Sequence, residues 1–198
     1  MITVGITAYN CHLWLQEAIN SLINQSSQDW EGVLVLDCKA DEETKQIFNK
    51  FNHNKFTKYV SKNNHGPFIN RAKAIELAKA EWYFQLDGDD ILPPKSIELI
   101  AGTIKTQSNA QYIYGNCEHF SENKSIIKTP KKDPDALCYG PLFNAASPIK
   151  KSLYYEMGGY SKDLFINADW NFWISVYENN IIGKYINQVL YKRRQREN

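Results

Sequence analysis

Long apolar runs are missing from this sequence of 198 residues, and no segment approaches the ~18 residues that a membrane-spanning helix requires. The first ten residues, MITVGITAYN, have neither the basic start nor the small-residue cleavage site of a secretory leader. An excess of one charge is missing as well, because 23 Lys and Arg residues balance 22 Asp and Glu residues. We therefore expect a cytoplasmic protein that binds no nucleic acid and associates with membranes at most peripherally.

Cysteine is scarce, and its spacing has no recognisable pattern. Cys11, Cys38, Cys117 and Cys138 form no CxxC pair and no zinc-site spacing. This usage indicates a reduced compartment in which the thiols are small core or loop residues. The GxxxxGK[ST] loop that cradles phosphates in P-loop proteins is also absent. A chain of this length can bury enough surface to fold without disulfides or a structural metal.

Apolar periodicity predicts alternating strands and helices through the first half of the chain. Strands are expected at residues 2–7, 30–36, 56–61, 82–86, 111–120 and 125–129. Helices are expected at residues 14–23, 42–52, 67–78, 95–105, 152–157 and 169–178, with Pro67 in the first turn of the third. No repeat or linker divides the chain, so we expect a single domain over residues 1–198.

Strands joined by helices of this length predict an α/β fold with a mostly parallel central sheet and flanking helices. In such sheets ligands bind beyond the carboxyl ends of the strands. Asn10, Asp37 and Asp87 each stand where a predicted strand ends. The pattern therefore predicts one site that these three positions share.

The sequence LDGDD at residues 86–90 is the densest group of carboxylates near that site. Three acidic side chains in four positions repel one another unless a cation or hydrogen-bond donors offset their charge. Carboxylates at the edge of a sheet suit Mg²⁺ or Mn²⁺ held together with substrate phosphates. Gly88 allows the backbone to turn tightly and to approach a ligand. An acidic cap at a helix N-terminus or a solvated turn is the alternative, whereas an EF-hand would need a later Glu that is missing.

Four segments, taken in order, resemble the family 2 glycosyltransferases, which have the GT-A fold. They are ITVGITAYN, LVLDCKADEET, NNHGPFINRAKAIELAKAEWYFQLDGDD and MGGYSKDLFINADWNFWI. Their order and separation over residues 1–178 carry the resemblance, since each motif alone is weak. The resemblance implies a Rossmann-like half at residues 1–90 that binds a nucleotide sugar, and a smaller acceptor half at residues 91–198.

The resemblance also implies a role for individual residues. Ala8 and Tyr9 would line the nucleotide pocket with Gly88, Asp37 would hydrogen-bond the base, and Arg71 would face the nucleotide. Asp87 would contact the ribose or a metal, and Asp89 would ligate a divalent cation, Mn²⁺ or Mg²⁺. Asp169 would be the general base that deprotonates the acceptor hydroxyl, a task suited to a carboxylate. An N-terminal helix cap is a compatible interpretation of Asp169.

The implied reaction is an inverting transfer of a sugar from a nucleoside diphosphate, most simply UDP, to a hydroxyl of a glycan or another acceptor. The cation would act as a Lewis acid on the diphosphate leaving group. Residues 131–141 are expected to form a polar, Pro-containing loop, and the acceptor specificity is expected to lie particularly in residues 131–148. His65, beside Gly66, is expected near the donor.

Three positions depart from the family pattern. Cys38 follows Asp37 where a second acid is common, and Ala168 precedes Asp169 where Glu is common. Arg196 stands where the family has a metal-binding His, which removes one protein ligand for a metal. Two interpretations of the basic C-terminal residues stay open: contact with the diphosphate, which guanidinium groups suit well, or a frayed tail.

Three other functions share parts of this sequence pattern. A sugar-nucleotide-binding protein without transferase activity is the main alternative, because of the three departures. A nucleotidyltransferase would have a Gly-rich basic loop after its first strand, but Ala8–Tyr9–Asn10–Cys11–His12 stand there. A haloacid-type phosphatase would need a nucleophilic Asp at the end of that strand, and none is present.

Overall fold

The computed structural model describes residues 1–62, 66–122, 124–128, 146–161, 163–164 and 166–196. Its elements, in chain order, are β1 (Ile2–Ala8), α1 (Leu15–Ile23), β2 (Trp30–Leu36), α2 (Glu42–Lys50), β3 (Phe56–Val60), α3 (Pro67–Leu77), β4 (Trp82–Asp87), α4 (Ser96–Thr106), β5 (Tyr112–Phe120), β6 (Ser125–Lys128), β7 (Ile149–Lys150), α5 (Lys151–Glu156), α6 (Ala168–Glu178) and β8 (Gly183–Arg194). The longest helices in this part of the chain have 11 residues, and none is long and apolar enough to cross a membrane.

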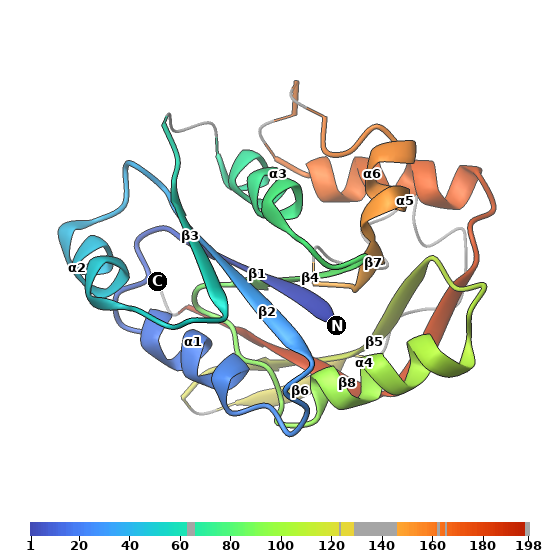
Figure 1. Cartoon of the computed structure of the whole chain (residues 1–198), viewed down its shortest axis with the longest axis horizontal. Coiled ribbons are helices and arrows are strands. Elements are labelled where there is room, and N and C mark those ends of the chain that lie inside the picture. Colours follow the sequence, from blue (N-terminus) through green and yellow to red (C-terminus); the bar gives the residue numbers. More distant parts are fainter. Residues whose placement is uncertain (63–65, 123, 129–145, 162, 165, 197–198) are drawn as a thin grey trace.

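The strands form one eight-stranded sheet in the order β3-β2-β1-β4-β7-β5-β6, with β8 paired to β5. The pairs β1–β2, β1–β4, β2–β3 and β5–β8 are parallel, whereas β7 joins β4 and β5 in antiparallel fashion. Helices α3, α5 and α6 cover one face, and α1, α2 and α4 lie on the other side (Figure 1). The predicted α/β fold with a mostly parallel sheet is confirmed.

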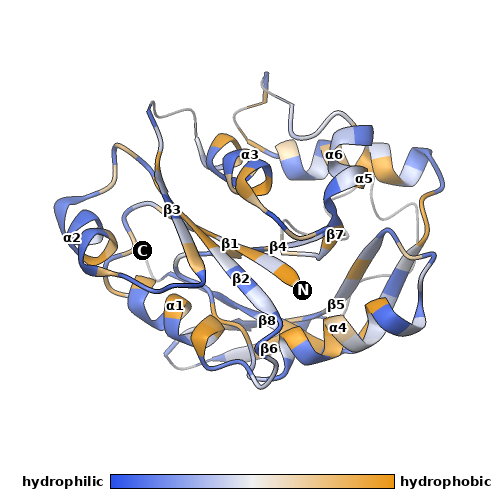
Figure 2. Ribbon diagram, viewed as in Figure 1, coloured by the Kyte–Doolittle hydropathy of each residue, from blue (hydrophilic) through white to orange (hydrophobic). Residues whose placement is uncertain are grey.

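Side-chain alternation along β2 explains why the sheet needs helices on both faces. Val33 and Val35 are buried in the cluster formed with α3, α5 and α6, while Leu34 and Leu36 belong to the cluster formed with α1, α2 and α4. Successive side chains of a strand point to opposite faces, so a continuous apolar run requires two covering layers. The hydropathy colouring follows this division, with apolar stretches on α1, α3 and α4 interrupted by hydrophilic ones (Figure 2).

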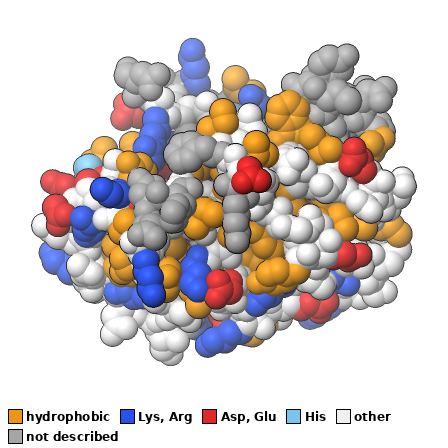
Figure 3. All heavy atoms as spheres, turned by 90° about the horizontal axis from the view of Figure 1, so that it is seen from above, with side chains coloured by type: hydrophobic (Ala, Val, Ile, Leu, Met, Phe, Trp, Pro, Cys, Tyr) orange, Lys and Arg blue, Asp and Glu red, His pale blue; other side chains and the backbone are white. Residues whose placement is uncertain are grey.

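The balanced composition is visible on the surface. On the face drawn in Figure 3, basic and acidic side chains both occur and are interspersed with apolar ones. The full sequence has a formal net charge of +1. Selectivity for an anionic ligand therefore has to come from local groups in a site rather than from the field of the whole protein.

The predicted strands and helices are present with small shifts at their ends, and residue 129 of the sixth predicted strand lies outside the described residues. Two strands were missed, β7 and β8. β7 has only two residues. β8 pairs β5 with register shifts between Gly115 and Asn116 and between Asn116 and Cys117, so its side chains do not follow a regular period of two.

Candidate active site

A cavity of about 400 Å³ opens at the carboxyl ends of β1, β2 and β4, which is the edge that the sequence predicted. A volume of this size suits a small ligand. Its lining residues are Thr7, Ala8, Tyr9, Cys11, Asp37, Gly66, Pro67, Asn70, Arg71, Asp87, Gly88, Asp89 and Arg196. The cavity thus brings together every residue that was expected to bind the nucleotide sugar or a metal. Asp169 is not among its lining residues.

Gly88 holds the turn of the acidic motif against β1. Its backbone N–H donates to the carbonyl oxygen of Thr7 at 3.0 Å. A Cβ atom at position 88 would lie 2.8 Å from that oxygen and 2.8 Å from the Sγ of Cys11. No ordinary side chain fits without moving the backbone, so glycine is needed here for close approach rather than for a positive φ.

We expect Gly88→Ala to lower the free energy of unfolding by about 1–3 kcal/mol, because the added methyl group collides with the backbone of β1. Gly102→Ala is the matched control. Position 102 lies inside α4, where a Cβ meets nothing within 4 Å. Alanine should raise stability there by up to about 1 kcal/mol, since glycine is a poor helix former. Urea denaturation of both variants measures the difference, and equal stabilities would contradict the packing argument.

Asp87 and Arg71 form a partly buried ion pair in the lining of the cavity. The Nη2 of Arg71 lies 2.5 Å from Oδ2 of Asp87, and its Nε lies 3.2 Å from Oδ1. Burial disfavours the charged carboxylate, but the guanidinium and the hydrogen bonds outweigh it and hold the pKa of Asp87 below its usual value. α3 therefore supplies a fixed counterion to the first acid of the motif.

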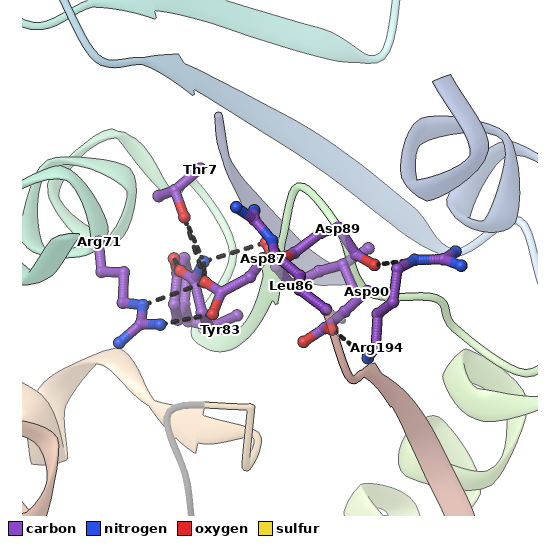
Figure 4. Close-up of polar contacts among 10 residues, drawn as sticks. Thr7, Arg71, Tyr83, Leu86, Asp87, Asp89, Asp90 and Arg194 are labelled. Atoms are coloured by element: carbon purple, nitrogen blue, oxygen red, sulfur yellow. Dashed lines mark hydrogen bonds and ion pairs between the residues drawn. The ribbon is translucent and has the colours of Figure 1, made fainter. Parts of the chain in front are cut away.

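A hydrogen-bond chain behind Asp87 keeps this carboxylate in place (Figure 4). The hydroxyl of Tyr83 donates to Oε1 of Gln85, and Nε2 of Gln85 donates to Oδ1 of Asp87 at 3.1 Å. Thr7 Oγ1 donates to the same Asp87 oxygen at 3.2 Å. Gln85 was not predicted as a site residue. The signal was a polar residue in the buried strand WYFQLD, since a buried amide needs partners.

Asp37 lies at the end of β2 and is more deeply buried than Asp87, with 2% of its surface exposed. Its Oδ2 accepts a hydrogen bond from Nδ2 of Asn70 at 2.7 Å, and its Oδ1 accepts one from the backbone N–H of Lys39 at 2.8 Å. Asn70 was not predicted either, although it lines the cavity next to Arg71 along the chain. α3 thus orients both Asp37 and Asp87, the acids at the ends of two parallel strands.

The C-terminal residues of the described chain are fixed to the acidic motif. Ile91 and Lys192 exchange two backbone hydrogen bonds of 3.0 and 2.8 Å. The backbone N–H of Arg194 donates to Oδ1 of Asp90 at 2.9 Å, and its Nε donates to the carbonyl oxygen of Asp89 at 2.9 Å. The interpretation of this segment as a frayed tail is therefore wrong for the residues described, up to residue 196.

The remaining two acids of the motif differ in environment. Burial, followed by the charge of Asp87, raises the pKa of Asp90 to about 8. The side chain of Asp89 is 20% exposed, and its Oδ2 accepts a hydrogen bond from Nε of Arg196 at 2.8 Å. Asp90 is thus a structural acceptor for β8, whereas Asp89 faces the cavity.

Asp169 stands in the first turn of α6, and Asn167, with φ of 59°, is the N-cap residue. The carboxylate of Asp169 accepts a hydrogen bond from the backbone N–H of Trp170 at 3.0 Å. The interpretation of Asp169 as the N-cap residue is therefore wrong, because Asp169 lies two positions after the N-cap. Burial disfavours the charged form of Arg71, but Asp87 and, more weakly, Tyr160 and Asp169 raise the pKa of the guanidinium. The charge of Asp169 thus acts on the Arg71 side of the site.

The fit of a divalent cation depends on which carboxylate oxygens are available. Both oxygens of Asp87 already accept hydrogen bonds from the protein, and Oδ2 of Asp89 accepts one from Arg196. Oδ1 of Asp89 accepts none from the described residues. Mg²⁺ often binds through one carboxylate together with substrate phosphates. The residues therefore fit a cation that is shared with a bound diphosphate, with Asp89 as its protein ligand.

A second group of possible ligands lies outside the cavity lining. Ligand atoms of His12, Asp41 and Glu43 lie within 4.8 Å of one another. His12 and Glu43 are exposed, and His12 Nδ1 is 3.4 Å from Asp41 Oδ2. Asp41 also caps α2 by accepting from the N–H of Thr44. Of the other expected site residues, His65 and most of the acceptor segment 131–148 lie outside the described residues.

The fold is that of GT-A glycosyltransferases. The chain is similar to the S. aureus protein TarS in complex with UDP-GlcNAc, with a TM-score of 0.83 and 21% identity over 100% of this chain and 59% of that one. The same protein in complex with UDP gives a TM-score of 0.78 at 19% identity, covering 98% of this chain and 60% of that one.

The chain belongs to the family described as Glycosyl transferase family 2, whose model matches residues 3–168. It is 25% identical over 209 residues to an uncharacterised glycosyltransferase of Methanocaldococcus jannaschii, covering 98% of this chain and 70% of the relative. It is 23% identical over 200 residues to the chondroitin synthase of Pasteurella multocida, covering 98% of this chain but only 20% of that protein. Family and relatives together support a glycosyltransferase enzyme.

Proposed function

We propose that the chain transfers a sugar from a UDP-sugar to an acceptor hydroxyl with inversion at the anomeric carbon. The observation that carries this proposal is the common cavity of Asp37, Arg71 and residues 87–89 at the carboxyl ends of three parallel strands. That cavity combines an oriented acid at one strand end with a charged cluster at another. The acid can accept a hydrogen bond from a neutral base, and the charged cluster can bind an anionic diphosphate. A nucleotide sugar has both of these groups.

Asp37 would accept a hydrogen bond from N3–H of the uracil ring, in a position fixed by Asn70. Ala8 and Tyr9 line the same cavity and would flank the nucleoside, with Gly88 allowing close approach. UDP is the nucleotide bound in the two TarS complexes. Similarity to that protein supports the choice of UDP for this chain.

Asp89 would hold a divalent cation, Mn²⁺ or Mg²⁺, together with the diphosphate of the donor, and Asp87 would contact the ribose or join the coordination after exchanging hydrogen bonds. When bound, the cation would stabilise the negative charge that develops on the leaving group. The chain's own contribution is to fix Asp89 next to the diphosphate through the turn at Gly88 and the backbone contacts of β8.

Asp169 would remove the proton of the acceptor hydroxyl as that oxygen bonds to the anomeric carbon. A base on the side of the sugar opposite the leaving diphosphate gives inversion. The proposed division of labour places most of the donor site in residues 1–90 and the acceptor and the base in residues 91–198. The alternative, a sugar-nucleotide-binding protein without transferase activity, would retain the first part and lose the second.

Thermal shift measurements with a panel of nucleotides and nucleotide sugars, with Mn²⁺ or with chelator, test the donor site. UDP and at least one UDP-sugar should raise the unfolding temperature, because a ligand of the native state stabilises it by mass action. Equal shifts with ADP and GDP would contradict the role of Asp37.

Asp37→Asn should weaken UDP binding by about tenfold or more, since it exchanges an acceptor for a donor at a charged hydrogen bond. Asp29→Asn is the control: Asp29 pairs with the N-terminus at 2.8 Å, and its side chain is 57% exposed. Calorimetric titration with UDP should give the control the affinity of the wild type. Unchanged affinity in the Asp37 variant would remove Asp37 from the base site.

A further inference from the structure

Arg196, which stands where the family has a metal-binding His, lines the cavity and is bonded to Asp89. Its Nε donates to Oδ2 of Asp89 at 2.8 Å, and its guanidinium lies over the ring of Trp14 with its Cζ 4.9 Å from the ring centroid. The side chain is 44% exposed and lines the same cavity as Asp87 and Gly88. Arg196 is therefore held on two sides while it remains open to a ligand.

The backbone that carries Arg196 is fixed independently of this ion pair. Gln195 donates its N–H to the carbonyl oxygen of Phe120 at 2.7 Å, and Arg194 is bonded to both Asp90 and Asp89. Arg194 also pairs with Glu17. Arg196 thus projects from an anchored strand end, so placing it next to a ligand costs little additional conformational entropy.

The charged residues that line the cavity offer an anionic ligand few free cationic groups. Three lining acids, Asp37, Asp87 and Asp89, stand beside two cations, Arg71 and Arg196. Arg71 directs Nε and Nη2 at Asp87. Within the described part of the chain, Arg196 makes a hydrogen bond through Nε alone, so both of its Nη groups remain available as donors.

We propose that Arg196 binds the diphosphate of the donor through its Nη groups, with Asp89 as the carboxylate that positions it. This inference rests on the proposed donor site. A guanidinium fork matches two phosphate oxygens and gives short, charge-assisted hydrogen bonds. Because Arg196 donates to Oδ2 of Asp89, Oδ1 of the same carboxylate stays available for a cation. The contact between Arg196 and the diphosphate itself needs no metal.

Calorimetric titration with UDP and with uridine, in chelator and in Mn²⁺, tests this role. In chelator, Arg196→Ala should weaken UDP binding by about tenfold or more relative to the wild type, while uridine binding changes less than twofold. The affinity of Arg196→Lys for UDP should lie between those of the wild type and Arg196→Ala, because the ammonium keeps the charge and loses the fork. Arg193→Ala, which removes the same charge three positions earlier, within β8, should bind UDP as the wild type does.

The outcomes separate the inference from the site on which it rests. If the wild type binds UDP and Arg196→Ala binds it equally well in chelator, the role of Arg196 is overturned and the donor site stands. A parallel loss of uridine binding in Arg196→Ala and Arg196→Lys would show a structural effect and would also overturn it. A wild type that binds neither UDP nor uridine would overturn the donor site and this inference together.

Discussion

Asp169→Asn is expected to bind a UDP-sugar as tightly as the wild type and to transfer its sugar about 10²- to 10⁴-fold more slowly. This range is the usual contribution of a general base, and an amide cannot accept the acceptor's proton. Asp169 does not line the donor cavity and acts on Arg71 more weakly than Asp87 does, so donor affinity should change little. The rate constant for transfer and the dissociation constant of the donor have to be measured on the same variant.

Asp163→Asn is the matched control, because Asp163 precedes α6 in the same segment and is exposed. It should keep both the affinity and the rate of the wild type. Near-normal turnover in Asp169→Asn would show that another group accepts the proton. Loss of donor affinity in that variant would instead place Asp169 in the donor site.

Arg71→Ala is expected to lower the free energy of unfolding by about 1–3 kcal/mol, since it leaves the partly buried carboxylate of Asp87 without its counterion. The side chain of Arg71 is 11% exposed, and the Gln85 and Tyr83 chain behind Asp87 cannot supply a positive charge. Urea denaturation monitored by circular dichroism measures the change.

Lys73→Ala, on the same helix, is the control for this loss. Lys73 pairs with Glu76 at 2.7 Å on the surface, and a pair of this kind contributes less than about 1 kcal/mol. Adding Asp87→Asn to Arg71→Ala should recover part of the stability, because it removes the unpaired charge. If Arg71→Ala were as stable as Lys73→Ala, the ion pair would have no structural importance.

The strand ends of the site could be predicted because a period of two and buried apolar runs mark strands in the sequence. Once β1, β2 and β4 were recognised as parallel, Asp37 and Asp87 had to lie at one edge of the sheet. Arg71 could be placed near them only through the resemblance to a family. Its pairing with Asp87 depends on where α3 crosses the sheet, which no local pattern encodes.

Contacts that join distant segments could not be predicted in the same way. Arg196 and Asp89 are separated by 107 positions and meet because β8 returns beside β5 and bonds to the loop after β4. The irregular register of β8 concealed that strand. Gln85 and Asn70 were detectable in principle, as polar residues in buried positions, but their partners were not.

Sugar transfer, and not only donor binding, is the activity that this cavity is proposed to support. Release of UDP from a panel of UDP-sugars, with sugar acceptors or water as the nucleophile, can be followed by nuclear magnetic resonance, which also reports the anomer formed. We predict that the wild type releases UDP from one donor and forms the inverted anomer. The Asp169→Asn variant should lose this reaction. Tight UDP-sugar binding without any UDP release under these conditions would contradict the account and favour a binding protein.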